Sequence, residues 1–185
     1  MIELPPPIEA YKVAELITLT RCGSPICWPM APYFGDGKIA FATGYVYPSK
    51  ALNAKRNPRV AVLFSDPTAS GRNDSDPITL VQGTAVVSDE DLQHNTERYV
   101  DRLQASGMAG IGVMLRVPLT RSLLVGYLCR IWIDVSPQQM VAWQREGPPP
   151  PELIAFRPVE FTPGPVSPDF GKVRDWLLRY PRPPS

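Results

Sequence analysis

The chain has 185 residues, of which 44% are hydrophobic, and its 19 Lys and Arg nearly balance its 18 Asp and Glu, leaving a net charge of +1. This length and composition fit one globular domain with an extra arm and argue against wholesale disorder. Because there is no basic excess, nucleic acid and membranes are not expected partners, and any anion site must be local.

Three cysteines and one histidine limit the redox and metal chemistry that we expect. Cys22, Cys27 and Cys129 are odd in number and widely spaced, which is typical of reduced cysteines in a cytoplasmic protein rather than of a disulfide framework. With one histidine and no C-x-x-C pair, no metal site is expected. No signal peptide and no apolar run of about 18 residues is visible, so we expect a cytoplasmic location.

Prolines mark the ends of the chain. Of the 23 prolines, many lie in the first ten residues or beyond residue 145. We therefore expect an N-terminal arm at 1–10, one folded domain at 11–145, and a proline-rich C-terminal arm at 146–185. That arm contains an apolar stripe that predicts a short helix near 168–179.

Alternating apolar and polar residues, separated by turn residues, predict six strands in the central part. In chain order, we expect a short helix at 9–15, strands at 17–21, 26–34 and 38–43, a helix at 49–56, strands at 59–64 and 78–87, a helix at 88–105, a short helix after Pro118, and a strand at 127–135. Residues 138–143 are expected to close the core. Short strands with a few inserted helices indicate a mainly β fold with flanking helices (α+β), a six-stranded closed or split barrel.

Single residues refine these expectations. Pro29 and Pro32 place their strand at a sheet edge or at a bulge, because proline cannot donate to the ladder. Gly83, inside a long strand, is expected to form a bulge. The spacing of Ser88 and Asp91 is that of a capping box and predicts a helix that begins there.

The segment 41–64 carries the clearest chemical signal, because it predicts a strand, a loop and then a helix start. The first amides of such a helix lack internal partners and favour an anion. Ser49 could add a hydroxyl, Lys50 a positive charge, and Thr43 a second hydroxyl. Local chemistry alone favours the simpler interpretation, in which Ser49 only starts a helix and Lys50 is solvated.

Several motifs in a fixed order resemble one family. They are A-T at 42–43, S-K-A-L-N at 49–53, N-P-R-V-A-V-L at 57–63, L-V-Q-G-T-A-V-V at 80–87, R-I-W-I-D-V at 130–135 and A-W-Q at 142–144. Together they resemble the FMN-binding split-barrel superfamily of pyridoxamine 5′-phosphate oxidase, which includes flavin- and deazaflavin-dependent oxidoreductases. The resemblance covers about residues 11–145.

The resemblance implies a cofactor site at the interface of a homodimer. It implies that the flavin phosphate lies beside Ala42 and Thr43 and is bound by Ser49 and Lys50, that the flavin ring lies along Trp28, Pro29 and Met30, and that Trp143 contacts the flavin of the neighbouring subunit. FMN is the expected cofactor, with an 8-hydroxy-5-deazaflavin of the F-420 type as the alternative and haem as a further one.

The sequence departs from the true pyridoxamine phosphate oxidases in two places, and the first departure argues against pyridoxamine phosphate oxidation. The W-Q at 143–144 is followed by Arg145, Glu146, Gly147 and prolines, without the histidine-bearing substrate motif of the true oxidases. The stretch 28–33 also contains no Lys or Arg, which leaves the choice among FMN, a deazaflavin and no cofactor open.

The resulting hypothesis is an oxidoreductase that passes a hydride between the cofactor ring and a small organic acceptor. No catalytic residue is assigned; Tyr33, Tyr45 and Tyr47 are the nearest possible proton donors. His94, on the polar side of its predicted helix, is expected to be a solvated histidine rather than a haem ligand. Two alternatives remain: a non-catalytic binder or carrier of flavin, haem or bilin, and a cofactor-free dimeric interaction module.

Overall fold

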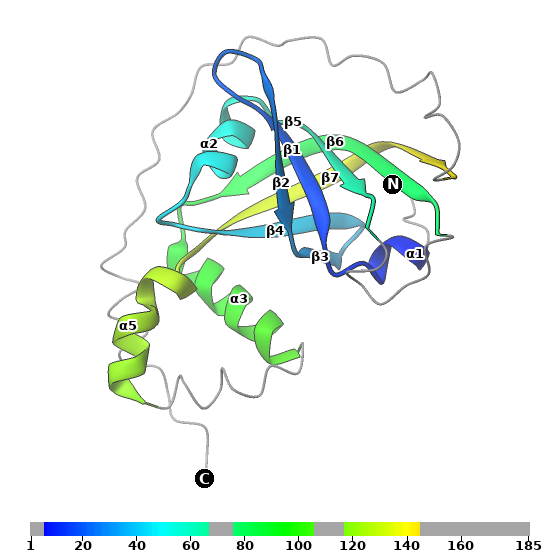
Figure 1. The fold of residues 1–185 in the computed structure, drawn as a ribbon. Helices are drawn as coiled ribbons and strands as arrows, with labels where there is room; N and C mark the ends of the chain where they lie inside the picture. Colours follow the sequence, from blue (N-terminus) through cyan, green and yellow to red (C-terminus); the bar gives the residue numbers. More distant parts are fainter. Residues whose placement is uncertain (1–5, 67–75, 106–116, 145–185) are drawn as a thin grey trace. The chain divides into compact units, whose positions relative to one another are not determined.

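The computed structural model describes residues 6–66, 76–105 and 117–144 (Figure 1). The chain divides into two compact units, which we describe separately: the first comprises Met1–Phe41, Ser49–Val87 and Ile133–Gly164, and the second comprises Ala42–Pro48, Ser88–Trp132 and Pro165–Ser185. The predicted helix near 168–179 lies outside the described residues.

The elements follow the predicted order with some changes at their ends. They are α1 Pro6–Glu9, β1 Ala14–Leu19, β2 Pro25–Met30, β3 Pro32–Gly35, β4 Lys38–Gly44, α2 Ser49–Arg56, β5 Arg59–Phe64, β6 Ile78–Ser88, α3 Leu92–Ala105, α5 Pro118–Leu128 and β7 Arg130–Trp143. Both α2 and β5 have the predicted bounds. Among the described residues, no helix combines the length and the apolar character that a membrane crossing requires.

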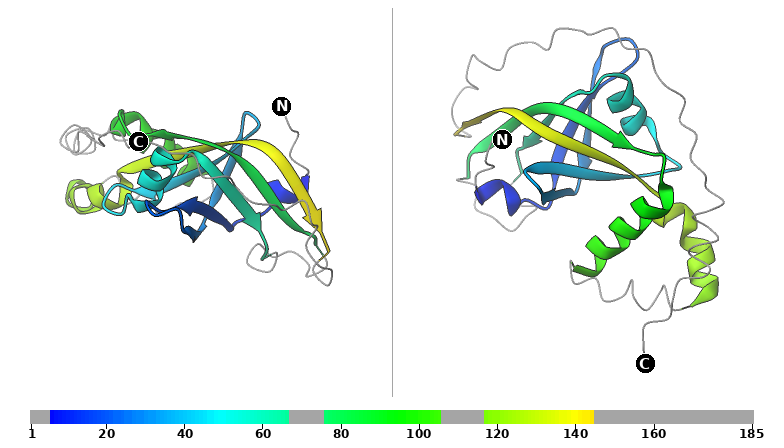
Figure 2. Two further views of the ribbon diagram at one scale, coloured as in Figure 1. Left: turned by 90° about the horizontal axis from the view of Figure 1, so that it is seen from above. Right: turned by 180° about the vertical axis from the view of Figure 1, so that it is seen from behind.

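The strands form one seven-stranded sheet in the order β2-β1-β5-β6-β7-β4-β3, and Figure 2 shows β6 and β7 side by side from two directions. The pairs β1–β2, β1–β5, β5–β6 and β3–β4 are antiparallel. The prediction of six strands was wrong because the stretch 26–34 forms two strands, interrupted at Ala31 before Pro32. Since β2 and β3 are the outer strands of the sheet, the edge position expected from the two prolines is confirmed.

The core of the first unit is built from alternating strand residues. In β1, Ala14, Leu16 and Thr18 are buried, and in β5 the side chains of Val60, Val62 and Phe64 are fully buried. Tyr11 packs edge-on against Phe64, with ring centroids 5.4 Å apart. Alternation therefore directs one face of β1 into the core, whereas in β5 Ala61 on the other face is buried as well.

Gly83 does not form the expected bulge against β5. The β5–β6 register is one residue to one through the pair of Val60 and Gly83. A Cβ at Gly83 would clash with the backbone carbonyl oxygen of Ser136 and would lie 3.0 Å from Cγ1 of Val135. The glycine is thus required by the close approach of β7, which a sequence pattern cannot distinguish from a bulge.

Several predicted ends of helices and strands were wrong. The first helix ends at Glu9, where the amide of Tyr11 donates to the carbonyl of Ile8, and residues 14–15 belong to β1 instead. The helix expected from Ser88 begins at Leu92, because Asp91 accepts a hydrogen bond from the amide of His94. This makes Asp91, rather than Ser88, the capping residue.

The strand expected at 127–135 begins three residues later. Residues 127 and 128 complete α5, which ends where the amide of Cys129 donates to the carbonyl of Val125. The segment 138–143 continues β7 and does not close the core: Gln138, Gln139 and Ala142 are exposed. In the second unit, the predicted apolar side of α3 is confirmed, since all of its members are buried: Leu92, Tyr99, Val100 and Leu103.

Candidate functional site

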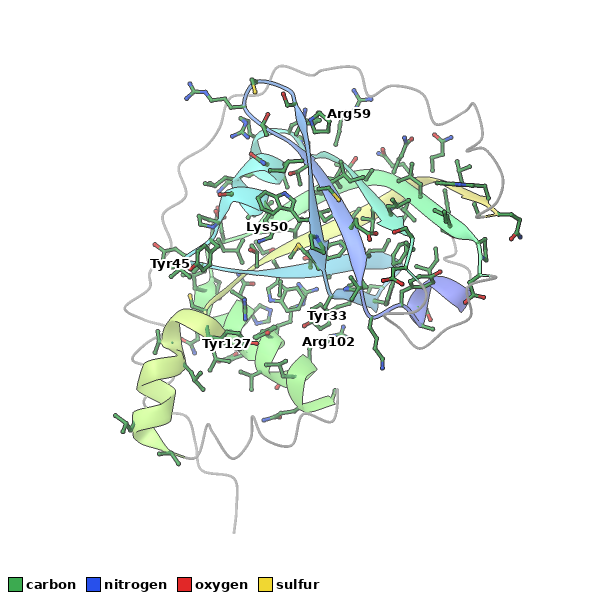
Figure 3. All side chains as sticks on the ribbon, in the orientation of Figure 1. Tyr33, Tyr45, Lys50, Arg59, Arg102 and Tyr127 are labelled. Atoms are coloured by element: carbon green, nitrogen blue, oxygen red, sulfur yellow. The ribbon has the colours of Figure 1, made fainter. Side chains whose placement is uncertain are left out.

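The first unit brings together two of the predicted site residues, Lys50 and Trp28. Lys50 lies in the first turn of α2, one residue after Ser49 (Figure 3). Its Nζ is 4.9 Å from the centroid of the Trp28 ring on β2, which is within the range of a cation–π interaction. A positive charge and an aromatic face are thus held side by side at the edge of the sheet.

Trp28 is oriented by a polar network that joins β1, β2 and α2. Its indole Nε1 donates to Oγ1 of the buried Thr18 at 3.2 Å, and Nδ2 of Asn53 donates to the same oxygen at 3.3 Å. Arg56 donates to Oδ1 of Asn53 and to the carbonyl oxygen of Leu19. Because a hydrogen-bonded ring cannot rotate freely, this network fixes the indole against the start of α2.

The charge of α2 is entirely positive. It carries Lys50, Lys55 and Arg56 and no acidic residue. The ammonium of Lys50 and the unpaired amides of the first turn both favour a bound anion at the start of α2. The first unit therefore has a local basic site despite the near-neutral chain.

The other predicted residues of β2 follow Trp28 directly. Pro29 is exposed and Met30 is half-buried. Cys27, which precedes them, is exposed, and partial burial together with the charge of Glu15 raises the pKa of its thiol. A thiol that stays protonated at neutral pH adds no negative charge beside the Lys50 ammonium.

Ala42 and Thr43 belong to the second unit, so their expected place beside a phosphate stays a prediction. The hydroxyl of the buried Thr43 donates to the carbonyl oxygen of Tyr47 at 3.2 Å, and the amide of Tyr47 donates to the carbonyl of Gly44. Thr43 therefore stabilises the turn that precedes Ser49 in the chain.

The remaining candidates are placed separately. Trp143 is half-buried near the end of β7, and its role at a dimer interface stays a prediction. Tyr33 and Tyr45 are half-buried, whereas Tyr47 is 74% exposed. His94 is exposed on α3. Among the described residues, no group of three or more His, Cys, Asp or Glu side chains is arranged to hold a metal ion.

Sequence reasoning did not identify the residues that position Trp28. Thr18 and Asn53 are 35 residues apart, and although Asn53 ends the S-K-A-L-N motif, the sequence predicted no role for either residue. The only available signal was that the buried face of β1 carries a threonine among apolar residues, a position where a hydroxyl needs a partner. The identity of that partner depends on how α2 packs.

No family model matches the chain, and no curated protein matches it. Several solved structures are similar to the chain. One is a candidate pyridoxamine 5′-phosphate oxidase from Listeria innocua, 16% identical, covering 74% of this chain and 91% of its own, with a TM-score of 0.49. Another is an F420 reductase, which is 17% identical. The match covers 76% of this chain and 98% of the reductase, with a TM-score of 0.49.

Two further solved structures extend this comparison. HutZ, the haem storage protein of Vibrio cholerae, is 13% identical, covers 70% of this chain and 84% of its own, and has a TM-score of 0.48. One more structure is 17% identical. The match covers 77% of this chain and 84% of that structure's chain, with a TM-score of 0.51. At these identities the similarity concerns the fold alone. The sheet described above confirms the mainly β fold that the sequence predicts.

Proposed function

We propose that the protein is a flavin- or deazaflavin-dependent oxidoreductase in which the start of α2 binds the cofactor phosphate. The observation that carries this proposal is the position of the Lys50 ammonium, 4.9 Å from the Trp28 ring centroid in the first turn of an all-basic helix. A phosphate-bearing ring system needs both kinds of contact, a charged donor for the phosphate and an aromatic or apolar surface for the ring.

The residues present fit FMN on chemical grounds. Lys50 and the hydroxyl and amide of Ser49 would hold a terminal phosphate, and Trp28, Pro29 and Met30 would provide the surface along the ring. When bound, the cofactor supplies hydride transfer to or from a small organic acceptor, while the protein contributes binding and orientation. A deazaflavin carries its phosphate as a diester, and the same residues would serve it with one charge fewer on the phosphate.

The binding experiment compares Lys50→Ala with Lys55→Ala, a matched loss of one lysine from the same helix. FMN and the deazaflavin are titrated separately, and ring absorbance and fluorescence quenching report binding. Lys50→Ala should weaken binding by about 1.5–3 kcal/mol, the scale of a charged hydrogen bond, and Lys55→Ala should change it much less. Equal effects of the two variants would place the phosphate elsewhere.

Turnover is tested separately from binding. The loaded protein is reduced without oxygen and mixed with electrophilic acceptors such as quinones and enones, and reoxidation is followed by ring absorbance. Acceptor-dependent reoxidation faster than that of the free cofactor supports the oxidoreductase. Tight binding without such acceleration would indicate a carrier, and a protein that binds neither cofactor would contradict the proposal.

We also propose a homodimer in which Trp143 of one subunit contributes to the cofactor site of the other. Light scattering of the purified protein should give twice the 20.5 kDa chain mass. Mixing Lys50→Ala and Trp143→Ala subunits should restore one intact site per mixed dimer if each site takes residues from both chains. A monomer that binds cofactor at full affinity would contradict this arrangement.

A further inference from the structure

A second cationic centre lies in the second unit, around Arg130 at the start of β7. Its guanidinium carbon is 4.3 Å from the ring centroid of Tyr99 and 4.5 Å from that of Tyr127. Nη2 donates to the hydroxyl of Tyr99 at 3.1 Å, and the buried Nε has no hydrogen-bond partner among the described residues. Within the described part of the chain, no carboxylate pairs with Arg130.

This environment leaves most of the hydrogen-bonding capacity of Arg130 unused. A guanidinium has five N–H donors, and the only hydrogen bond that it makes among the described residues is the one to Tyr99. Two aromatic faces offset part of the cost of desolvating a charge, but they do not satisfy its in-plane donors. Those donors form a planar fork that matches a carboxylate or a phosphate.

The surroundings of Arg130 also supply a second donor. The hydroxyl of Tyr99 donates to the hydroxyl of Tyr127 at 3.4 Å, so the proton of Tyr127 remains available to an acceptor. Tyr127 is 52% exposed at the end of α5 (Figure 3), and Arg130 is half-buried. The side chain of Tyr127 and part of Arg130 are therefore exposed to solvent.

Gly44 leaves space for the guanidinium of Arg130, because it has no side chain. A Cβ at Gly44 would be 3.3 Å from Nη1 of Arg130, closer than an ordinary contact. The neighbouring backbone is held in place, since the amide of Tyr45 donates to the carbonyl of Cys129 at 3.0 Å. An alanine at position 44 would thus shift the charged end of Arg130 by a few tenths of an ångström without removing it.

We propose that Arg130 and the hydroxyl of Tyr127 bind the oxyanion, carboxylate or phosphate, of a small organic molecule. This site is independent of the proposed cofactor site, because it shares no residue with Lys50, Ser49 or the β2 segment. The competing interpretation is that Arg130 only ties α3 to α5 through the two tyrosines, in which case its remaining donors select no anion.

The first experiment locates binding at Arg130 itself. Arginine Nε–H resonances are followed by ¹⁵N-correlated NMR while sodium phosphate, sodium acetate or sodium chloride is added at matched ionic strength. The Arg130 resonance, assigned by its loss in Arg130→Lys, should shift saturably with phosphate or acetate and not with chloride. Identical shifts with all three salts, or none with any, would overturn the proposal.

The second experiment measures affinity by calorimetry in the Lys50→Ala background, so that phosphate bound at α2 does not contribute. Arg130→Lys keeps the charge but loses the fork, and binding should weaken at least about tenfold. Gly44→Ala should weaken it in the same direction. Arg98→Lys is the matched control, because Arg98 stacks on the Trp132 ring at 4.0 Å in the same unit, and it should leave affinity unchanged.

The comparison of phosphate with acetate assigns the ligand class. Stronger binding of phosphate indicates a phosphate ester as the natural ligand, and stronger binding of acetate indicates a carboxylic acid. If Arg98→Lys weakens binding as much as Arg130→Lys, the anions respond to general charge and the proposed site does not exist. Anion binding that persists when FMN binding is lost in Lys50→Ala separates this site from the cofactor proposal.

Discussion

The Nζ of Lys50 on α2 lies 4.9 Å from the ring centroid of Trp28 on β2, two residues that are far apart in sequence and belong to the same unit. The contact joins an edge strand to the helix that follows β4 in the chain. It also places the only basic residue in the first turn of α2 against an indole whose N–H is already bonded to Thr18. We expect this pair to be energetically coupled.

The coupling can be measured by a double-mutant cycle of Trp28→Leu and Lys50→Met on the free energy of unfolding in urea. A coupling energy of about 0.5–1 kcal/mol is expected, the range of an accessible cation–π pair. The same cycle with Lys55→Met should give no coupling beyond error. If Lys50 and Lys55 behave alike, the contact contributes nothing in solution.

Gly83 should not tolerate a side chain. Gly83→Ala would drive a methyl group into the backbone of Ser136, and backbone cannot move aside as a flexible side chain can. We expect a loss of about 1–3 kcal/mol or more in the free energy of unfolding. Gly126→Ala is the control, since no atom lies within 4 Å of its added Cβ in α5, and it should stabilise by about 0.5–1 kcal/mol. Similar losses at both positions would refute the close approach of β7.

Asp91 should act as the cap of α3. Its Oδ1 accepts a 2.9 Å hydrogen bond from the amide of His94, one of the donors that the helix itself leaves unpaired. Asp91→Ala should lower the free energy of unfolding by about 0.5–2 kcal/mol, and Asp91→Asn should recover most of that loss. The exposed neighbour provides the comparison: Glu90→Ala should have little effect, and Ser88→Ala should not reproduce the loss of a cap.

Cys22 should be the most reactive thiol among the three cysteines. The hydroxyls of Thr20 and Ser24 lie 3.2 Å and 3.6 Å from its sulfur, and these hydrogen bonds lower its pKa to about 7. Burial raises the pKa of Cys129 to about 11. Because a lowered pKa means more thiolate at a given pH, alkylation of Cys22 should rise through a pH of about 7 and then level off.

The pH profile of alkylation by iodoacetamide, read by mass spectrometry of the intact protein, tests this assignment. Cys22→Ser should abolish the phase centred near neutral pH. Thr20→Val removes the largest stabilising contact and should move that midpoint to higher pH. A first modification at Cys27 or Cys129 in the folded protein would contradict the assigned order of reactivity.

Where the sequence and the structure agree, the signal is local. The bounds of α2 and β5 were predicted because a helix start at Ser49, a stop at Asn57-Pro58 and a short β-branched run lie within a few residues of each other. Where they disagree, two local signals competed. The capping pattern predicted a helix start at Ser88, but Asp91 accepts the capping hydrogen bond and α3 begins at Leu92.

The sequence by itself determined the mainly β character, the order of most elements and the presence of a basic helix start after β4. Only the tertiary structure decided that Trp28 faces Lys50, that Gly83 makes room for β7, and that Arg130 lies between two tyrosines. Arg130 and Tyr99 are 31 residues apart and meet through α3 and β7. The physical reason is that backbone hydrogen bonding and alternation act over a few residues, whereas the partners of a charged side chain depend on how distant elements pack.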